Sequence, residues 1–383
     1  MIEARMNRRG LVLLAGVALL GGCKVIPKGA DTTPAPEPAP TDSLPKDQAR
    51  HRIALLVPLS GPNEALGNSI ANATTMAILD TNAQTIRITT YDTASGPAAA
   101  ASQAVKDGNK LILGPLLADD VGTVAAIARP ARVPLITYSN EGSVASRDVF
   151  VMGHTVESSV SRVVRFAASK GVTRFAVLAP KGDYGARATA AYTVAVRAVG
   201  GTLVASESYD RGNNSIVSAT ARLKAKGSAQ AVLIADSPRY AALAAPRLKS
   251  AGAAGPRILG TEMWSGDPLA SSAPALRGAW FAAVSDTRFR QFSTSYKARF
   301  GVAPYRLATL GYDSVLLTVR IARDWRPGTV FPIGRLVDSG GFLGLDGPFR
   351  FAAGGNGDRA LEVRETRAGG LTVISPAPEK FVD

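Results

Sequence analysis

Short apolar runs alternate with helix-periodic segments from Arg52 onward. Apolar runs that are nearly continuous predict strands buried on both faces, as in a parallel sheet covered by helices. The expected strands are Ile53–Val57, Ile86–Tyr91, Leu111–Leu113, Pro134–Thr137, Val149–Met152, Phe175–Ala179, Thr202–Ser206, Ala231–Ala235, Arg257–Leu259 and Ala279–Ala283.

The segments between these runs carry the period of an α-helix. Leu66, Ile70 and Ala73 repeat at intervals of four and three, and the helical segment Tyr184–Val199 stops at Gly200-Gly201. Strands that alternate with helices predict an α/β fold whose sheets are doubly wound and mostly parallel, with right-handed crossovers. A chain of 383 residues is long enough for two lobes with separate cores.

The front of the chain is typical of an export signal rather than of a fold. A basic start precedes the apolar run Leu11–Leu20, which is shorter than the ~20 residues that cross a bilayer. The end of that run, Leu20-Gly21-Gly22-Cys23, resembles a bacterial lipobox. Residues 1–22 are therefore expected to be a lipoprotein signal peptide, and Cys23 is expected to carry the lipid. Lys24 in place of aspartate favours the outer membrane, facing the periplasm.

Residues 23–50 are rich in proline and poor in large apolar side chains. Such a segment cannot bury enough surface to offset its ordering entropy, so we expect an extended tether. The net charge of +14 could attract anionic partners such as acidic lipid heads or cell-wall polymer, but a solvated basic surface is the favoured explanation. Nucleic acid is not an expected partner of an exported chain without a dense basic run.

Few residues offer catalytic or metal-binding chemistry. Cys23 is the single cysteine, so the mature domain has no disulfide, thiolate zinc site or thiol nucleophile. The two histidines are His51, at the edge of the tether, and His154, expected at a helix start or on the surface. No Walker loop and no Gly-x-Ser-x-Gly elbow is present. We therefore expect no enzyme activity, no metal and no cofactor.

Five motifs in order give the chain a family resemblance. They are RIALLVPLSGPNEALGNSIANATTMAI (Arg52–Ile78), LILGPL (Leu111–Leu116), VPLITYSN (Val133–Asn140), GDYG (Gly182–Gly185) and GFLGLDGPFRF (Gly341–Phe351). This order resembles the type I periplasmic binding proteins of the leucine-binding kind. The resemblance implies a domain at 51–376, followed by a tail at 377–383. It implies a first lobe at about 51–153 and 285–335, and a second at about 154–284 and 336–376.

Ligands in such folds bind beyond the carboxyl ends of the strands. Tyr184 matches the pocket-lining aromatic of the family, and Glu262 matches the acidic residue that pairs with an ammonium. The loop after the third strand, by contrast, lacks the serine hydroxyl that holds a ligand carboxylate in relatives. The candidate cleft residues are Ser60, Asn63, Leu116, Leu117, Ser139, Asn140, Tyr184, Glu262 and Trp264. The alternative is that these loops only satisfy their own backbone.

The departures from the amino-acid-binding pattern indicate a branch of the family. VPLSGPNEALGNSIANA, LILGPL, YSNEGSVAS and GLDGPFRF are similar to the penicillin-binding protein activators. That resemblance implies an outer-membrane lipoprotein that stimulates a peptidoglycan synthase, with a small ligand in the cleft as an open question. The alternative function is a solute-binding receptor of an ABC importer for amino acids or related small molecules.

Overall fold

The computed structural model describes residues 50–248 and 255–381. The expected signal peptide, Cys23 and nearly all of the tether lie outside the described residues, as do the last two residues of the tail. The compact unit that begins at Pro45 contains both lobes. No helix in the described ranges is long and apolar enough to span a membrane.

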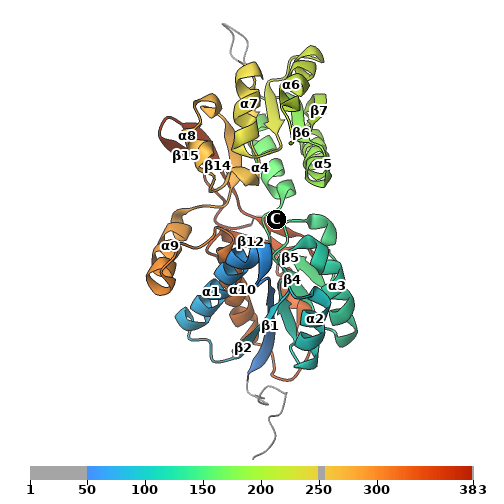
Figure 1. Ribbon diagram of the computed structural model, residues 1–383, viewed down its shortest axis with the longest axis vertical. Coiled ribbons are helices and arrows are strands. Elements are labelled where there is room, and N and C mark those ends of the chain that lie inside the picture. The colour runs from blue at the N-terminus through green and yellow to red at the C-terminus, as the bar shows by residue number, and fades with distance from the viewer. Residues whose placement is uncertain (1–49, 249–254, 382–383) are drawn as a thin grey trace, which may run out of the picture. The chain divides into compact units, whose positions relative to one another are not determined.

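The first lobe is built on a five-stranded sheet with the order β2-β1-β3-β4-β5, and all of its strands are parallel (Figure 1). Its strands are β1 (His51–Val57), β2 (Ile86–Asp92), β3 (Leu111–Leu113), β4 (Leu135–Thr137) and β5 (Val149–Val151). Its helices are α1 (Glu64–Asp80), α2 (Pro97–Lys106), α3 (Ala118–Ala128), α9 (Thr287–Phe300) and α10 (Ala308–Ala322).

Alternating residues of β1 decide which helices cover which face of this sheet. Ile53, Leu55 and Val57 belong to the core beneath α1 and α10. Ala54 and Leu56 point the other way, into the core beneath α2 and α3. Successive side chains of a strand face opposite sides, so a strand that is apolar at every position needs a helical layer on each face.

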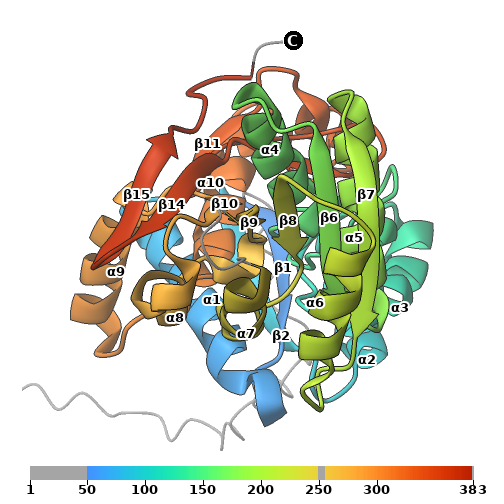
Figure 2. The same cartoon turned by 90° about the horizontal axis from the view of Figure 1, so that it is seen from above.

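The second lobe contains a seven-stranded sheet with the order β15-β14-β10-β9-β8-β6-β7. Its strands are β6 (Arg174–Pro180), β7 (Thr202–Tyr209), β8 (Ala231–Ile234), β9 (Arg257–Leu259), β10 (Trp280–Ala283), β14 (Glu362–Arg367) and β15 (Gly370–Ser375). Its helices are α4 (Val156–Ser169), α5 (Asp183–Ala198), α6 (Ser215–Ala225), α7 (Pro238–Leu248) and α8 (Pro268–Ser272). Helices α4 and α5 cover one face, and α6 and α7 cover the other (Figure 2). Strands β14 and β15 are antiparallel additions to a parallel sheet.

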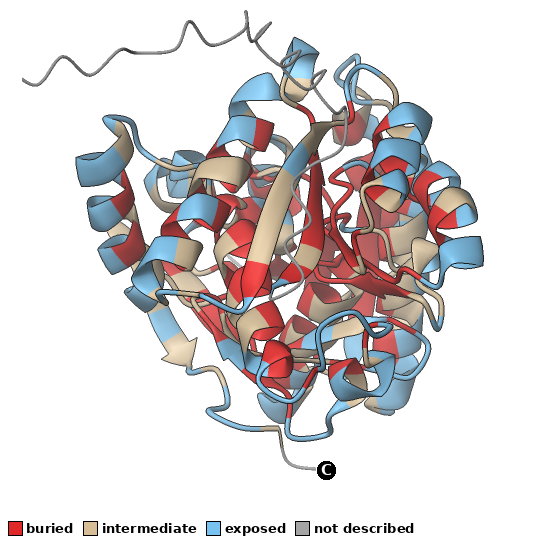
Figure 3. Cartoon of the chain, turned by 90° about the horizontal axis from the view of Figure 1, so that it is seen from below, coloured by how far each residue is buried: buried red, intermediate tan, exposed pale blue. Residues whose placement is uncertain are grey.

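Burial follows this layering, because the strands are largely buried and the outer faces of the helices are exposed (Figure 3). All ten expected strands are present, with ends that differ by up to three residues, and the α/β fold class is confirmed. Short 3-10 helices complete the loops: η1 (Gly61–Asn63), η2 (Arg129–Ala131), η3 (Gly142–Val144), η4 (Glu262–Trp264), η5 (Pro274–Leu276) and η6 (Ile333–Val337).

A small third sheet changes the expected border between the lobes. It consists of β11 (Phe342–Gly344), β12 (Gly347–Phe351) and β13 (Gly357–Arg359). The expectation that the second lobe resumes at 336 is wrong, because Phe342, Phe349 and Phe351 pack in the first lobe's core. Phe351 meets Phe150 of β5 edge to face at 5.4 Å. The chain rejoins the sheet of the second lobe only at β14.

His51 is part of the fold rather than of the tether edge. It is the first residue of β1, is 3% exposed, and stacks on Trp325 at 3.7 Å between ring centres. Its Nε2 also lies 3.0 Å from the Trp325 carbonyl oxygen. The pairing links residues 274 apart in sequence, so the local pattern around His51 did not reveal it.

Candidate functional site

The candidate residues of the first lobe lie in loops that follow β1, β3 and β4. Ser60 donates to Asp92 at 2.9 Å, and Asn63 is the residue before α1 and makes no capping hydrogen bond with its side chain. Leu116 is buried in the core, whereas Leu117 is 39% exposed at the start of α3. The structure therefore assigns Leu116 to packing and leaves Leu117 accessible.

The loop after β4 mostly satisfies its own backbone. The Ser139 hydroxyl accepts a hydrogen bond from the Glu141 N–H at 3.1 Å, and Ser139 is 2% exposed. Asn140 is exposed, and its carbonyl oxygen accepts from Arg187 Nη1 at 3.4 Å. Arg187 Nη2 also pairs with Glu141 at 3.2 Å. This arginine belongs to α5, so it connects the second lobe to the first.

The structure brings Tyr184 and Glu262 together. The Tyr184 hydroxyl donates to Glu262 Oε1 at 3.0 Å and lies 2.9 Å from Thr261 Oγ1. Because the tyrosine proton is used by Glu262, the Thr261 hydroxyl donates to the tyrosine oxygen. Tyr184 stands in the first turn of α5, where Gly185 permits the helix to approach the end of β6 closely. A Cβ at Gly185 would lie 1.7 Å from the Pro180 carbonyl oxygen.

One carboxylate oxygen of this pair has no partner. Glu262 is half-buried, but its Oε2 is closed off from solvent and accepts no hydrogen bond from the described residues. Burial raises the pKa of Glu262 from an ordinary 4.5 to about 7, although the hydrogen bond from Tyr184 acts to lower it. Burial and the neighbouring Glu262 likewise hold the pKa of Tyr184 well above its usual value.

Two arginines flank the Tyr184 ring. The Arg187 and Arg211 guanidinium carbons lie 6.0 and 5.8 Å from the ring centre. Arg211 pairs with the buried Asp236 at 2.9 Å. Arg187 Nε, by contrast, is buried and has no hydrogen-bond partner in the described ranges. A buried carboxylate oxygen and a buried guanidinium N–H, both unpaired, therefore lie around one tyrosine.

A small cavity of about 20 Å³ adjoins Glu262. Its lining includes Ser158, Ser265 and Arg359, and the Ser265 hydroxyl and Arg359 Nη1 also lack partners among the described residues. A cavity of this volume holds about one water molecule, which would satisfy two to four such groups. Sequence reasoning missed these three residues, because they come from three distant segments and no local pattern marks them.

Trp264 is a core residue, and the expectation that it lines the cleft is wrong. It is 0% exposed, and its Nε1 donates to the Asp236 carbonyl oxygen at 2.8 Å. Its ring fills the space above Gly260, where an added Cβ would lie 2.4 Å from ring atoms. Trp264 thus supports the short 3-10 turn η4 that carries Glu262, but it does not face a ligand.

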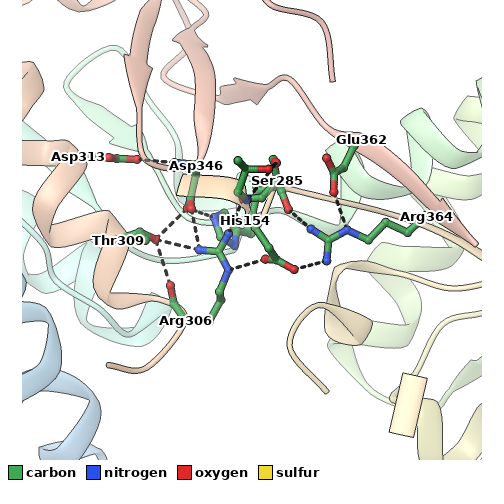
Figure 4. A network of polar contacts seen from close by, with 11 residues as sticks. His154, Ser285, Arg306, Thr309, Asp313, Asp346, Glu362 and Arg364 are labelled. Carbon is green, nitrogen blue, oxygen red and sulfur yellow. Dashed lines mark hydrogen bonds and ion pairs between the residues drawn. The ribbon is translucent and has the colours of Figure 1, made fainter. Parts of the chain in front are cut away.

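A buried polar network lies where the chain passes between the lobes (Figure 4). Asp346, at 0% exposure, accepts hydrogen bonds from Arg306 Nη1 at 2.6 Å and from Thr309 at 2.9 Å, and lies 2.8 Å from His154 Nε2. Asp313 accepts from the backbone N–H of Leu345 at 2.6 Å. His154 is therefore not a surface residue, since Asp346 provides a buried partner 192 residues away.

The charges in this network control one another's protonation. Burial alone would raise the pKa of Asp346, but Arg306 and His154 hold it far below its usual value. Burial and, second to it, the neighbouring Asp346 raise the pKa of Asp313 to about 7. Burial lowers the pKa of His154, against the opposing effect of Asp346. A neutral His154 donating from Nε2 fits this arrangement.

The network continues across the second passage between the lobes. Arg364 of β14 pairs with Asp286 at 2.5 Å and with Glu362 at 2.7 Å, and donates to the Val284 carbonyl oxygen at 2.7 Å. Arg306 lies 3.5 Å from the same Asp286. The three passages between the lobes, near His154, Asp286 and Glu362, are thus linked by shared polar contacts. In the described ranges, no group of three or more histidine, cysteine or acidic side chains is placed to hold a metal ion.

The family model described as periplasmic binding protein matches residues 51–370. The chain belongs to the periplasmic binding protein family.

Several solved structures with the same fold come from ABC transporters. This periplasmic binding protein resembles a proposed branched-chain amino acid ABC transporter from Rhodospirillum rubrum, with a TM-score of 0.76 and 20% identity over 85% of this chain and 100% of that one. A branched-chain amino acid transporter substrate-binding protein from Streptococcus pneumoniae, in complex with isoleucine, has a TM-score of 0.61 and 18% identity over 85% of this chain and 100% of that one. A solute-binding protein from R. palustris, in complex with benzoate, has a TM-score of 0.60 and 18% identity over 87% of this chain and 98% of that one.

A curated relative adds less. An uncharacterized protein of Rickettsia prowazekii (strain Madrid E) is 28% identical over 141 residues, which are 36% of this chain and 38% of that protein. The match therefore covers well under half of that relative's length. The expected periplasmic binding protein family is confirmed, and the solved structures share its two-lobed fold.

Proposed function

We propose that this periplasmic binding protein is a non-enzymatic solute receptor of an ABC importer, with an amino acid or a related zwitterion as its ligand. The observation that carries the proposal is the pair of unpartnered buried groups beside Tyr184, namely Glu262 Oε2 and Arg187 Nε. A ligand ammonium would pair with the first, and a ligand carboxylate with the second.

A buried polar atom without a hydrogen-bond partner is energetically costly. Arg187 already pairs with Glu141 through Nη2, and Glu262 already accepts from Tyr184 through Oε1, so the unsatisfied atoms are Arg187 Nε and Glu262 Oε2. A bound zwitterion would supply an acceptor for the first atom and a donor for the second. A ligand with one charge would supply only one of them, so it is expected to bind more weakly.

The first lobe supports this orientation. The loop after β3 offers no hydroxyl, and Asp119 and Asp120 stand in the first turn of α3. Burial raises the pKa of Asp120, and the neighbouring Asp119 raises it further. A ligand carboxylate placed there would meet negative charge. Arg187 of the second lobe is therefore the favoured carboxylate partner.

The test is calorimetric titration of the purified protein with leucine, isoleucine and benzoate. Leucinamide, which lacks the carboxylate, and N-acetyl-leucine, which lacks the ammonium, separate the two contacts. Binding of an amino acid should weaken at least tenfold in Glu262→Gln and in Arg187→Gln. The matched control is Arg197→Gln, an exposed arginine of the same helix without a partner among the described residues.

Each single-charge analogue should be insensitive to one of these changes: leucinamide to Arg187→Gln, and N-acetyl-leucine to Glu262→Gln. A ligand at 100 times its dissociation constant adds about 2.7 kcal/mol of stability, so a thermal scan checks the same point independently. Failure of every amino acid to bind or to stabilise the protein would refute the zwitterion assignment.

A second candidate is the activator of a penicillin-binding protein, with a peptidoglycan synthase as its partner. The observation that favours it is the contact of Arg187 with the Asn140 carbonyl oxygen and the Glu141 carboxylate, which links the lobes without a ligand. A domain whose lobes are joined in this way could present a fixed surface to a protein partner. Stimulation of a synthase from the same cell by the ligand-free protein, unchanged by amino acids, would support this candidate against the first.

The location belongs to the proposal as well. The lipobox-like residues before Cys23 support a lipid anchor, and Lys24 supports the outer membrane with the domain facing the periplasm. The test variant combines Cys23→Ser with an ordinary cleavable secretory signal in place of residues 1–22. This variant should appear in the soluble periplasmic fraction. Continued sedimentation of that variant with outer membranes would argue against the anchor.

A further inference from the structure

A second, larger cavity shares Arg359 with the small cavity beside Glu262. Its volume is about 520 Å³, and it is lined by residues of α4, of β12 and β13, and of the described end of the chain. Ser158, Arg359 and Leu361 line both this cavity and the small one beside Glu262. A volume of this size is in the range of pockets that hold small molecules.

The walls of this cavity carry more positive than negative charge. Five cationic side chains line it, against the two carboxylates of Glu157 and Asp358; the cations are Arg162, Arg165, Arg350, Arg359 and Lys380. Asp358 forms an ion pair with Arg350 at 3.5 Å, so Glu157 is the one other carboxylate that lines the cavity. Such a concentration of like charge in a concave surface attracts anions from solution.

Most of these cations have no acidic hydrogen-bond partner. Arg162 donates to the Leu361 carbonyl oxygen at 2.9 Å and to the Ser375 hydroxyl at 2.6 Å, which are both neutral acceptors. Arg165 and Lys380 are exposed and make no hydrogen bond or ion pair within the described residues. Positive charge is therefore available at the cavity wall rather than neutralised by it.

Arg359 has a buried N–H group that lacks an acceptor. It is 8% exposed and donates from Nη2 to the Met152 carbonyl oxygen at 2.7 Å, yet its Nη1 is buried without a partner among the described residues. A buried guanidinium N–H that lacks an acceptor is costly, and a charged acceptor would make a strong hydrogen bond with it. An anion in either adjoining cavity could reach this group, and only the larger cavity has room for more than about one water molecule.

We propose that this cavity is a second binding site, separate from the Tyr184–Glu262 site, for a small hydroxylated anion such as a phosphorylated or carboxylated sugar. The anionic group pairs with Arg165 and Arg359, and Ser158 and Ser161 offer hydroxyls beside it. Glu157, whose Oε2 is buried and unpaired, accepts a hydrogen bond from a ligand hydroxyl. A bare inorganic anion would leave Glu157 unsatisfied and most of the volume empty.

The test is calorimetric titration of the full protein with glucose 6-phosphate and with glucuronate. Inorganic phosphate and glucose are the comparison probes, since each carries only half of the required chemistry. We expect both sugar anions to bind at least tenfold more tightly than phosphate or glucose. Arg165→Gln should weaken them about tenfold, because a charge-assisted contact is lost and 1.4 kcal/mol corresponds to a factor of ten.

Arg197→Gln is the matched control, because it removes an exposed, unpaired arginine from another helix of the same lobe and lowers the net charge equally. It should leave binding unchanged, and so should Tyr184→Phe, which lies at the other site. Equal weakening by Arg165→Gln and Arg197→Gln would mean non-specific attraction and overturn the proposal. So would failure of both sugar anions to bind, or binding only to vesicles that contain phosphatidylglycerol, which would indicate a membrane surface instead.

Discussion

Glu262 makes the stability of the domain depend on pH in a direction opposite to most carboxylates. Its folded-state pKa is about 7, against an ordinary value of 4.5. At 1.36 kcal/mol for each pH unit, the difference corresponds to about 3 kcal/mol between the protonated and ionised forms. The perturbation is Glu262→Gln, which keeps the size and the acceptor for Tyr184 but removes the ionisation.

The sign follows from proton binding in the two states. Between pH 4.5 and 7, the folded protein holds a proton on Glu262 that the unfolded chain has released. The contribution of this group to the free energy of unfolding is therefore intact below pH 4.5 and is lost as the pH rises through about 7. The wild type and Glu262→Gln should be nearly equally stable at pH 4, and the variant should be more stable by about 3 kcal/mol at pH 8.

The assay is urea unfolding of both proteins at intervals from pH 4 to pH 8, without ligand, with the difference in unfolding free energy plotted against pH. All other titrating groups are shared, so their effects cancel in the difference. A difference that stays flat across this range would refute the reasoning, because it would mean that Glu262 ionises in the fold as readily as in water. Arg197→Gln is expected to show that flat behaviour.

Three further changes test the supports of the site and the passage between the lobes. Trp264→Ala should lower the free energy of unfolding by roughly 3–5 kcal/mol, measured by urea unfolding, because a fully buried ring is removed. Gly185→Ala should cost about 1–3 kcal/mol and weaken amino-acid binding, because its Cβ would displace α5 from the Pro180 carbonyl; unchanged stability and affinity would contradict the close approach. Asp346→Asn should cost roughly 3–5 kcal/mol at pH 7, because Arg306 would lose a buried charged partner, and a thermal shift near zero would contradict that role.

The local pattern of the sequence determined the strands and most of the layering. In β1, apolar residues at every position require cover on both faces, and the helices α1, α10, α2 and α3 provide it. Tyr184 and Glu262 could also be found from sequence, because each matches a pocket residue of the type I periplasmic binding proteins in a loop or helix start after a strand. Signals of this kind act over a few residues, so they are visible without knowing the fold.

The tertiary structure decided which side chains meet across long sequence separations. The sequence places Trp264 beside Glu262 and therefore suggests a cleft residue. In the structure its ring packs in the core, in the space that the missing side chain of Gly260 leaves. His154 has no partner near it in the sequence, but the fold places Asp346, 192 residues away, within hydrogen-bond distance. No local sequence pattern marks Arg359, yet it lines both cavities. Hydrophobic periodicity reports that a position is buried, whereas charge pairing and cavity lining depend on which distant segment packs against it.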